Sequence, residues 1–180
     1  MAVNFNGGSK LKAALNKLSQ KVKDGGHVRV GYLEGAKYDD EKHTPVAQVA
    51  AWDEFGTPTA PPRPFMRDTI AKHSDQWGDG LGKALKATDY DVNRALAGVG
   101  SIIVGQIIDQ IDEGSYQPNA PLTNLLKDRF PKGDYSTEDF LKAVHDLKNG
   151  ADAPEGTPLN WSDRMRNSTA YEVKDGPDES

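Results

Sequence analysis

The stretch "DVNRALAGVGSIIVGQIIDQIDEG", residues 91–114, constrains the fold most, because its apolar residues recur at helical spacing over about six turns. These residues form one stripe and widen it on both sides: Val99, Ile103, Ile107, Ile111, Ile102, Val104 and Ile108. So broad an apolar face predicts a helix that is buried on more than one side. Gly98, Gly100 and Gly105 would let a second helix or strand approach it closely.

Two strands are predicted at the two ends of the chain. "HVRVGYL", residues 27–33, alternates apolar and polar side chains, as a half-buried strand does. "TAYEVKDG", residues 169–176, predicts a final strand with Tyr171 and Val173 on one face. The segments between them read mainly as helices, so we expect an α+β fold in which a small antiparallel sheet packs against two or more long helices.

Apolar periodicity and capping residues predict the remaining helices. A first amphipathic helix begins near Ser9 and stops at Gly25–Gly26, and a second begins after Thr44, with Pro45 at its first position and Gly56 as its stop. A third runs from Phe65 to about Thr88, with a break expected at its three glycines, residues 78–82. Shorter helices are expected in the ranges 122–130, 137–147 and 161–168.

Length and composition favour one domain over residues 1–180. Within it, residues 131–157 resemble an insertion, and we expect the acidic tail 175–180 to be mobile. The mean hydropathy of -0.69 is low for a self-sufficient chain of 180 residues, which favours an oligomer. The N-terminus lacks a signal-peptide pattern, and no apolar run approaches the roughly 18 residues of a membrane span, so we expect a protein made in a cytoplasm.

Charge is distributed unevenly along the chain. The net charge is -5, which argues against wrapping nucleic acid through phosphate contacts. Residues 1–30 hold six basic residues and one acidic residue, so that this end is at +5 and the rest of the chain at -10. Such a dipole could orient copies head to tail in a ring. A solvated helix face explains the lysines by themselves equally well.

No set of residues in the sequence indicates catalysis. The absence of cysteine excludes disulfides and thiolate metal sites. The histidines His27, His43, His73 and His145 are scattered without zinc-ligand spacing, and "WGDGLGKA" at Trp77 fails the phosphate-loop pattern. No carboxylate pair has the apolar surroundings that acid-base catalysis needs. We therefore expect no enzyme activity, no cofactor and no metal.

A proline-rich segment, "EFGTPTAPPRPFM", is the most unusual feature outside the helices. Its prolines fix φ and hold the chain extended, so that its side chains have little entropy left to lose on binding. Arg63 could form a forked pair with a carboxylate of its own chain or of a neighbour, and Phe65 would anchor the next helix. A rigid loop packed within one subunit and an arm laid on a neighbouring subunit are equally compatible with these residues.

Several stretches in order resemble the neck and tail-completion (head-tail joining) proteins of tailed bacteriophages. They are "VRVGYLEG", "VAQVAAWDEFGT", "APPRPFMRDTI", "GSYQPNAPLTNLLK" and "PLNWSDRMRNSTAYEV". Each is short, and their order between about residues 28 and 173 is the specific part of the match. Two features depart from the family pattern: Trp161–Asp163 stands where Thr-Gly is common, and the segment 131–157 has no clear counterpart.

This resemblance implies a structural virion protein that forms a ring, often sixfold, at the head-tail interface. Its partners would be copies of itself, the head-closure or adaptor proteins, and the tail tube or terminator. DNA would at most pass through the channel, with no membrane involved. The residues expected at subunit contacts are Phe55, Pro62, Arg63, Pro64, Phe65, Met66, Arg67 and Arg166.

Three other readings remain open at this point. A tail terminator, which caps the tail tube before joining, is built from similar small α+β rings. A peptide-binding adaptor would be a monomer with a groove along a sheet edge. An enzyme would need a pocket with clustered, perturbed carboxylates or histidines.

Overall fold

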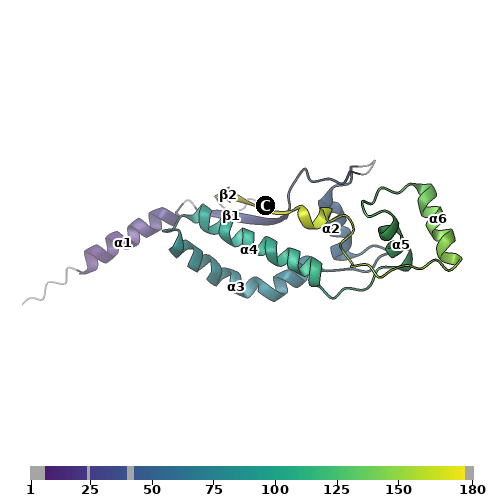
Figure 1. The fold of residues 1–180 in the computed structure, drawn as a ribbon. Coiled ribbons are helices and arrows are strands. Elements are labelled where there is room, and N and C mark those ends of the chain that lie inside the picture. The colour runs from purple at the N-terminus through teal and green to yellow at the C-terminus, as the bar shows by residue number, and fades with distance from the viewer. Residues whose placement is uncertain (1–6, 24, 40–42, 177–180) are drawn as a thin grey trace, which may run out of the picture.

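The computed structural model describes residues 7–23, 25–39 and 43–176. Within them it contains seven helices and one two-stranded antiparallel sheet, so the predicted α+β class is confirmed. The molecule is elongated, with α1 (Gly7–Val22) projecting from one end and α5 (Pro121–Arg129) and α6 (Thr137–Lys148) at the other (Figure 1). The last four residues of the predicted acidic tail, 177–180, lie outside the described residues; Asp175 belongs to the sheet.

The sheet pairs β1 (Gly26–Tyr32) with β2 (Thr169–Asp175), in a register that runs from Gly26 opposite Asp175 to Tyr32 opposite Thr169. It covers α4 (Val92–Glu113), and α3 (Phe65–Ala87) packs against α4 in antiparallel fashion beside the sheet. The sheet therefore rests mainly on one long helix, whereas two or more were expected. As predicted, α4 is covered on more than one side, because both the sheet and α3 pack against it.

The main core lies where α4 meets the sheet, α3 and the start of α2 (Val46–Phe55). Its buried apolar members are Val46, Ala50, Phe65, Val99, Ile103, Ile107, Ile111 and Met165, the last from the short helix α7 (Arg164–Asn167). In the described chain α4 is the one helix long and apolar enough to cross a membrane, and four of its apolar side chains, Val99, Ile103, Ile107 and Ile111, are buried in this core.

Two local predictions about the helices were wrong. Pro45 occupies the N-cap position of α2, where Thr44 was expected. The glycines of α3 do not break it, and it continues to Ala87. Each glycine costs about 1 kcal/mol relative to alanine in a helix, but Trp77, Leu81 and Ala84 pack on the main core and hold the helix together.

The expected extended arm is not confirmed. Gly56 ends α2 with a φ of 78°, and the chain then makes a tight turn closed by Thr57 and Ala60. A Cβ at Gly56 would lie 2.9 Å from the backbone nitrogen of Pro62, so only glycine fits this fold-back. The Arg63 N–H then donates to the Asp53 carbonyl over 2.6 Å. The prolines therefore stiffen a corner between α2 and α3 and do not project as an arm.

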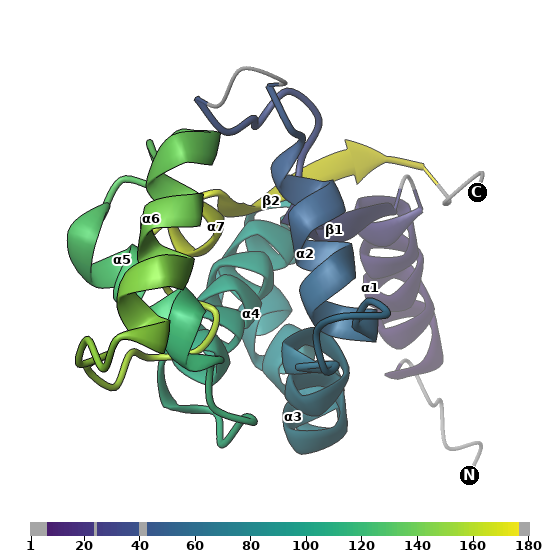
Figure 2. The same ribbon diagram turned by 90° about the vertical axis from the view of Figure 1, so that its right-hand side faces the viewer.

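The segment after residue 120 builds a second, smaller cluster. Leu125 and Leu126 of α5 pack on Ala143 of α6, and the rings of Tyr135 and Trp161 stack beside them at 5.6 Å. The end-on view shows this pair of helices set apart from α3 and α4 (Figure 2). Residues 131–157, which the sequence suggests are an insertion, thus belong to a lobe that also includes α5 and Trp161.

Close approach between α4 and the sheet leads to a paired prediction. A Cβ at Gly100 would lie 2.8 Å from both Tyr171 and Val28, whereas a Cβ at Gly98 would meet nothing. Gly100→Ala should destabilise the fold by about 1–2 kcal/mol, because overpacking outweighs the gain in helix propensity. Gly98→Ala should instead stabilise it by up to about 1 kcal/mol. Urea unfolding of both variants checks the difference in sign, and equal effects would contradict the packing of α4 on the sheet.

Candidate assembly surface

The corner between α2 and α3 is organised by a buried carboxylate, that of Glu54, whose residue is only 5% exposed. Its oxygens accept hydrogen bonds from the backbone N–H groups of Met66 and Arg67, at 2.9 and 3.2 Å, and from Arg67 Nε at 2.8 Å. The first N–H groups of a helix have no intrahelical partner and carry partial positive charge. Glu54, at the end of one helix, thus caps the start of the next.

Arg63 lies at the centre of the corner and is buried. Its Nη2 donates to Asn119 Oδ1 over 3.1 Å, and its Nε and Nη2 both point at the Gln117 carbonyl, at 3.4 Å. The expected carboxylate partner is present but distant, since Nη1 lies 3.7 Å from Asp53 Oδ1. Asn119 in turn contacts a later loop, since its Nδ2 donates to the Gly156 carbonyl. Arg63 thereby ties the corner to the loops that lead to the second lobe.

The charged side chains beside Arg63, those of Asp53 and Lys127, are partly buried. Burial raises the pKa of Asp53 above its ordinary value, and the positive charges of Arg63 and Lys127 oppose that rise. Burial, with a further contribution from Arg63, lowers the pKa of Lys127 to about 8. Lys127 Nζ donates to the carbonyls of Thr157 and Asn160, at 2.8 and 2.7 Å. These contacts have a structural purpose, since they fasten the 157–160 loop to α5.

Beside the buried corner lies an exposed aromatic surface, which we call the corner patch: Trp52, Phe55 and Arg67. Phe55 is 69% exposed, and the guanidinium carbon of Arg67 lies 5.2 Å from the centre of its ring. Trp52, three residues earlier in α2, is 47% exposed. Exposed aromatic side chains beside an arginine are typical of binding hot spots.

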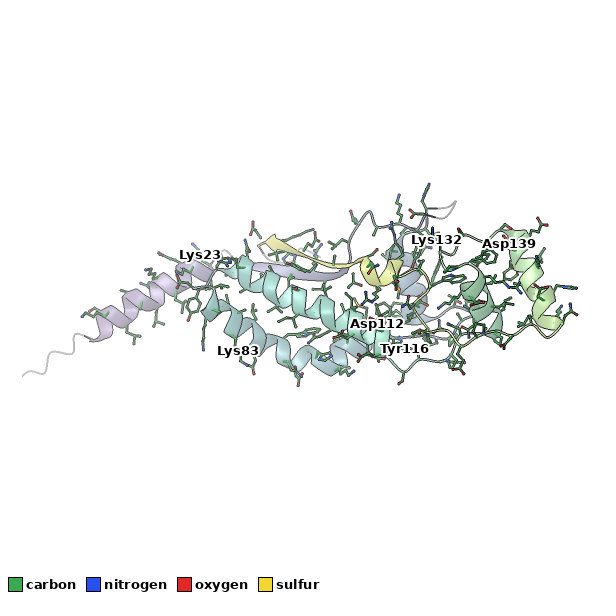
Figure 3. All side chains as sticks on the ribbon, viewed as in Figure 1. Lys23, Lys83, Asp112, Tyr116, Lys132 and Asp139 are labelled. Atoms are coloured by element: carbon green, nitrogen blue, oxygen red, sulfur yellow. The ribbon has the colours of Figure 1, made fainter. Side chains whose placement is uncertain are left out.

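The remaining residues expected at subunit contacts are not in one place. Phe65 is fully buried in the main core, Met66 and Pro64 are half-buried, and Pro62 is exposed. Arg166 lies on α7, where its Nε contacts both carboxylate oxygens of Asp112 at 3.1 and 2.8 Å. Figure 3 labels Asp112 near the end of α4. The structure therefore favours an internal role for Arg63 and Phe65 and leaves Phe55, Pro62 and Arg67 accessible.

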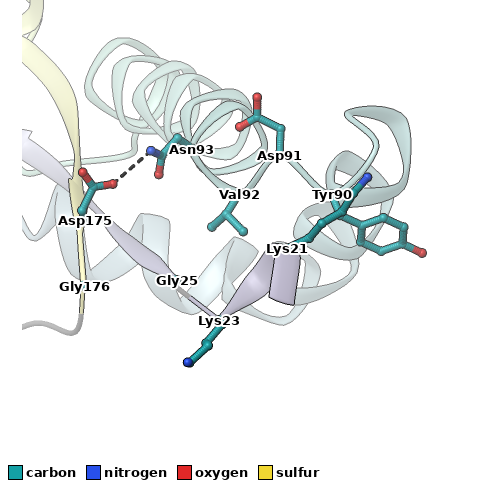
Figure 4. A pocket seen from close by; sticks show the side chains of 9 residues that line it. All are labelled: Lys21, Lys23, Gly25, Tyr90, Asp91, Val92, Asn93, Asp175 and Gly176. Atoms are coloured by element: carbon teal, nitrogen blue, oxygen red, sulfur yellow. Dashed lines mark hydrogen bonds between the residues drawn. The ribbon is translucent and has the colours of Figure 1, made fainter. Parts of the chain in front are cut away.

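A polar cleft of about 700 Å³ lies at the base of α1 (Figure 4). Several of its polar side chains form hydrogen bonds within the chain. Asp91 caps α4 by accepting from the Arg94 N–H, and Asn93 donates to Asp175 over 3.0 Å. The described residues contain no group of three or more histidines and carboxylates placed to hold a metal ion. The polar residues of this cleft therefore have structural contacts near the C-terminal end of α1.

Sequence reasoning missed two residues of the corner between α2 and α3, Glu54 and Trp52. Nothing in the sequence distinguishes Glu54 from the other carboxylates, because its role depends on burial against the start of α3. Trp52 could have been found, since its spacing of three from Phe55 puts both aromatic rings on one helix face.

Comparisons with family models, curated proteins and solved structures gave no match to this chain.

Proposed function

We propose that the chain is a structural virion protein, which assembles into a ring at the head-tail interface of a tailed phage and leaves a channel for DNA. The observation that carries this proposal is the distribution of exposed large apolar side chains. They lie on separate elements: Leu11 and Leu15 on α1, Trp52 and Phe55 on α2, Ile70 on α3 and Ile102 on α4. Leu11 and Leu15 are neighbours on α1, and Trp52 and Phe55 are neighbours on α2, and grouped exposed apolar side chains of this kind mark interaction surfaces.

Several different exposed surfaces suit a ring better than a twofold dimer. A twofold contact uses one self-complementary patch, whereas a head-to-tail contact joins two different patches and closes into a ring when the rotation permits. The charge distribution suits the same arrangement. Figure 3 shows Lys23 toward the α1 end of the long molecule and Asp139 at the opposite end. The acidic bulk of the chain would also line a channel without gripping DNA phosphates.

The proposed partners follow from the resemblance to neck proteins: copies of the chain, head-closure or adaptor proteins on one side, and tail tube or terminator proteins on the other. Assembly would occur in the host cytoplasm and the product would stay in the virion. Binding would be the whole mechanism, with no chemical step.

Light scattering of the purified protein at several concentrations tests the ring. We expect a ring-sized species, or a monomer that converts to one as concentration rises. In a second experiment, the protein is incubated with isolated heads and tails, and the joined particles are counted. Association with tails alone would move the proposal to a tail terminator. A strict monomer that binds neither heads nor tails would overturn it.

Phe55→Ala tests whether the corner patch takes part in assembly. Because Phe55 is largely exposed, its loss should change unfolding by less than about 0.5 kcal/mol. Ring formation should require roughly tenfold more protein, as expected for an aromatic hot spot. Lys142→Ala, at an exposed polar position on α6, is the control and should leave assembly unchanged. Equal ring formation by both variants would remove the patch from the interface.

A further inference from the structure

The apolar face of α1 is uncovered in the described chain. Leu11 and Leu15 are 61% and 56% exposed, and no described element packs along this helix. Figure 1 shows it pointing away from the body. An isolated helix of 16 residues is marginal in water, so its stability must come from a surface that covers it. The stripe formed by Leu11, Leu15, Leu18 and Val22 predicts where that surface lies.

A second uncovered apolar surface lies on the body, where the sheet covers α4 and leaves α3 beside it. A groove of about 420 Å³ runs between β1 and α3. Its walls are almost wholly apolar and include Val28, Val30, Met66, Ile70, Trp77 and Leu81. Ile70 is 49% exposed at its rim. We call this surface the α3 groove.

Small residues line the outer edge of the α3 groove. Ser74, Gly78 and Gly82 follow one another at intervals of four, so they lie along one side of α3. A Cβ at Gly78 or Gly82 would meet nothing within 4 Å, so no packing inside the subunit requires glycine there. Each costs about 1 kcal/mol of helix stability relative to alanine. Close approach of another helix to these glycines would compensate for the loss of helix stability.

We propose that α1 of one copy docks in the α3 groove of a neighbouring copy. The dimensions agree: at 1.5 Å per residue the stripe of α1 from Leu11 to Val22 is about 17 Å long, and the span from Met66 to Leu81 is about 22 Å. The charges also agree. Lys10 and Lys17 project from the polar side of α1, and beyond the glycines α3 carries Asp75 and Asp79, which make no ion pair among the described residues.

We assign a second copy as the occupant, because α1 points away from its own body in the folded chain (Figure 1). The Lys21 ammonium pairs with the Asp89 carboxylate and also donates to the Asp89 carbonyl, at the turn between α3 and α4. Only residues 23–25 join α1 to β1, so the helix would have to reverse its direction at this short link to reach its own α3 groove. This inference deepens the proposed ring and rests on it for self-association. It assigns the contact that links successive subunits.

Disulfide trapping tests the contact directly, since the natural chain has no cysteine. Leu15→Cys and Ile70→Cys are made in separate chains, mixed and oxidised mildly. We expect a covalent heterodimer on a non-reducing gel. Ala13→Cys, on the opposite face of the same helix, is the matched control and should give at least tenfold less heterodimer with Ile70→Cys.

The outcomes separate this inference from the ring itself. Rings by light scattering without a heterodimer would overturn the docking of α1 and leave the ring standing. A heterodimer without a ring-sized species would uphold the docking and overturn the ring. The double variant Leu15→Cys/Ile70→Cys distinguishes one further occupant, because a cross-link within one chain would show that α1 covers its own groove and would overturn exchange between copies. Binding of α1 to anionic phosphatidylserine vesicles, in place of any cross-link, would also overturn it.

Discussion

Glu54→Gln should lower the free energy of unfolding by about 3 kcal/mol, although it removes only a charge and keeps the shape of the side chain. Both oxygens of Glu54 accept, and all three of their partners are donors: Met66 N, Arg67 N and Arg67 Nε. An amide offers one acceptor and turns its NH₂ group toward the remaining donor. A buried helix start then keeps an unsatisfied N–H, which costs about 1–3 kcal/mol in addition to the lost charged hydrogen bonds.

Two control variants sharpen this test. Glu113→Gln changes an exposed glutamate at the end of α4 and should alter stability by less than about 0.5 kcal/mol. Arg67→Ala removes the ion pair and leaves the capping bonds. Because the Arg67 side chain is 57% exposed, this variant should cost no more than about 1 kcal/mol. Urea unfolding measures all three, and a cost for Glu54→Gln equal to that of Arg67→Ala would show that the carboxylate acts only as a surface ion-pair partner.

This corner illustrates what the sequence could and could not predict. Gly56 and the apolar stripes of α2 and α3 are local signals, so the two helices and the end of α2 were predicted, whereas the proline-rich segment between them was expected to be an extended arm. The direction of the turn depends on long-range contacts, above all those of Arg63 with residues 117 and 119, some 55 positions later. Proline stiffness alone cannot distinguish an arm that projects from one that folds back.

The same distinction holds for the rest of the chain. The strands, α4 and α6 were predicted because their periodicity is strong and mostly complete within each element. Residues 131–157 were taken for an insertion, whereas they form one lobe with α5 and Trp161, because the core of this lobe is assembled from three separated segments. The uncovered stripe of α1 was visible in the sequence as an amphipathic helix. Only the fold shows that nothing in the described chain covers it.

Phe65→Ala is expected to have the largest effect on stability of any single change at the corner. Phe65 is completely buried, and its ring packs edge-to-face with the ring of Tyr32, with the two ring centroids 6.3 Å apart. Removal of a buried phenylalanine leaves a cavity and costs about 3–5 kcal/mol. For a chain of 180 residues this corresponds to a fall in Tm of about 10 °C. Calorimetry or thermal unfolding followed by circular dichroism measures it.

The result also decides between the two roles that the sequence allows for Phe65. An anchor on a neighbouring subunit would leave the monomer stable and weaken the ring, whereas a core residue lowers the stability of the monomer first. Phe65→Leu keeps most of the volume and should cost about 1 kcal/mol, so its subunits remain folded and their assembly can be measured at 20 °C below the Tm. We expect rings from Phe65→Leu at nearly the natural concentration. Loss of rings from this folded variant would place Phe65 at the subunit contact, and the corner would then have to open during assembly, exchanging the bonds of Glu54 and Arg63 for contacts with the neighbouring copy.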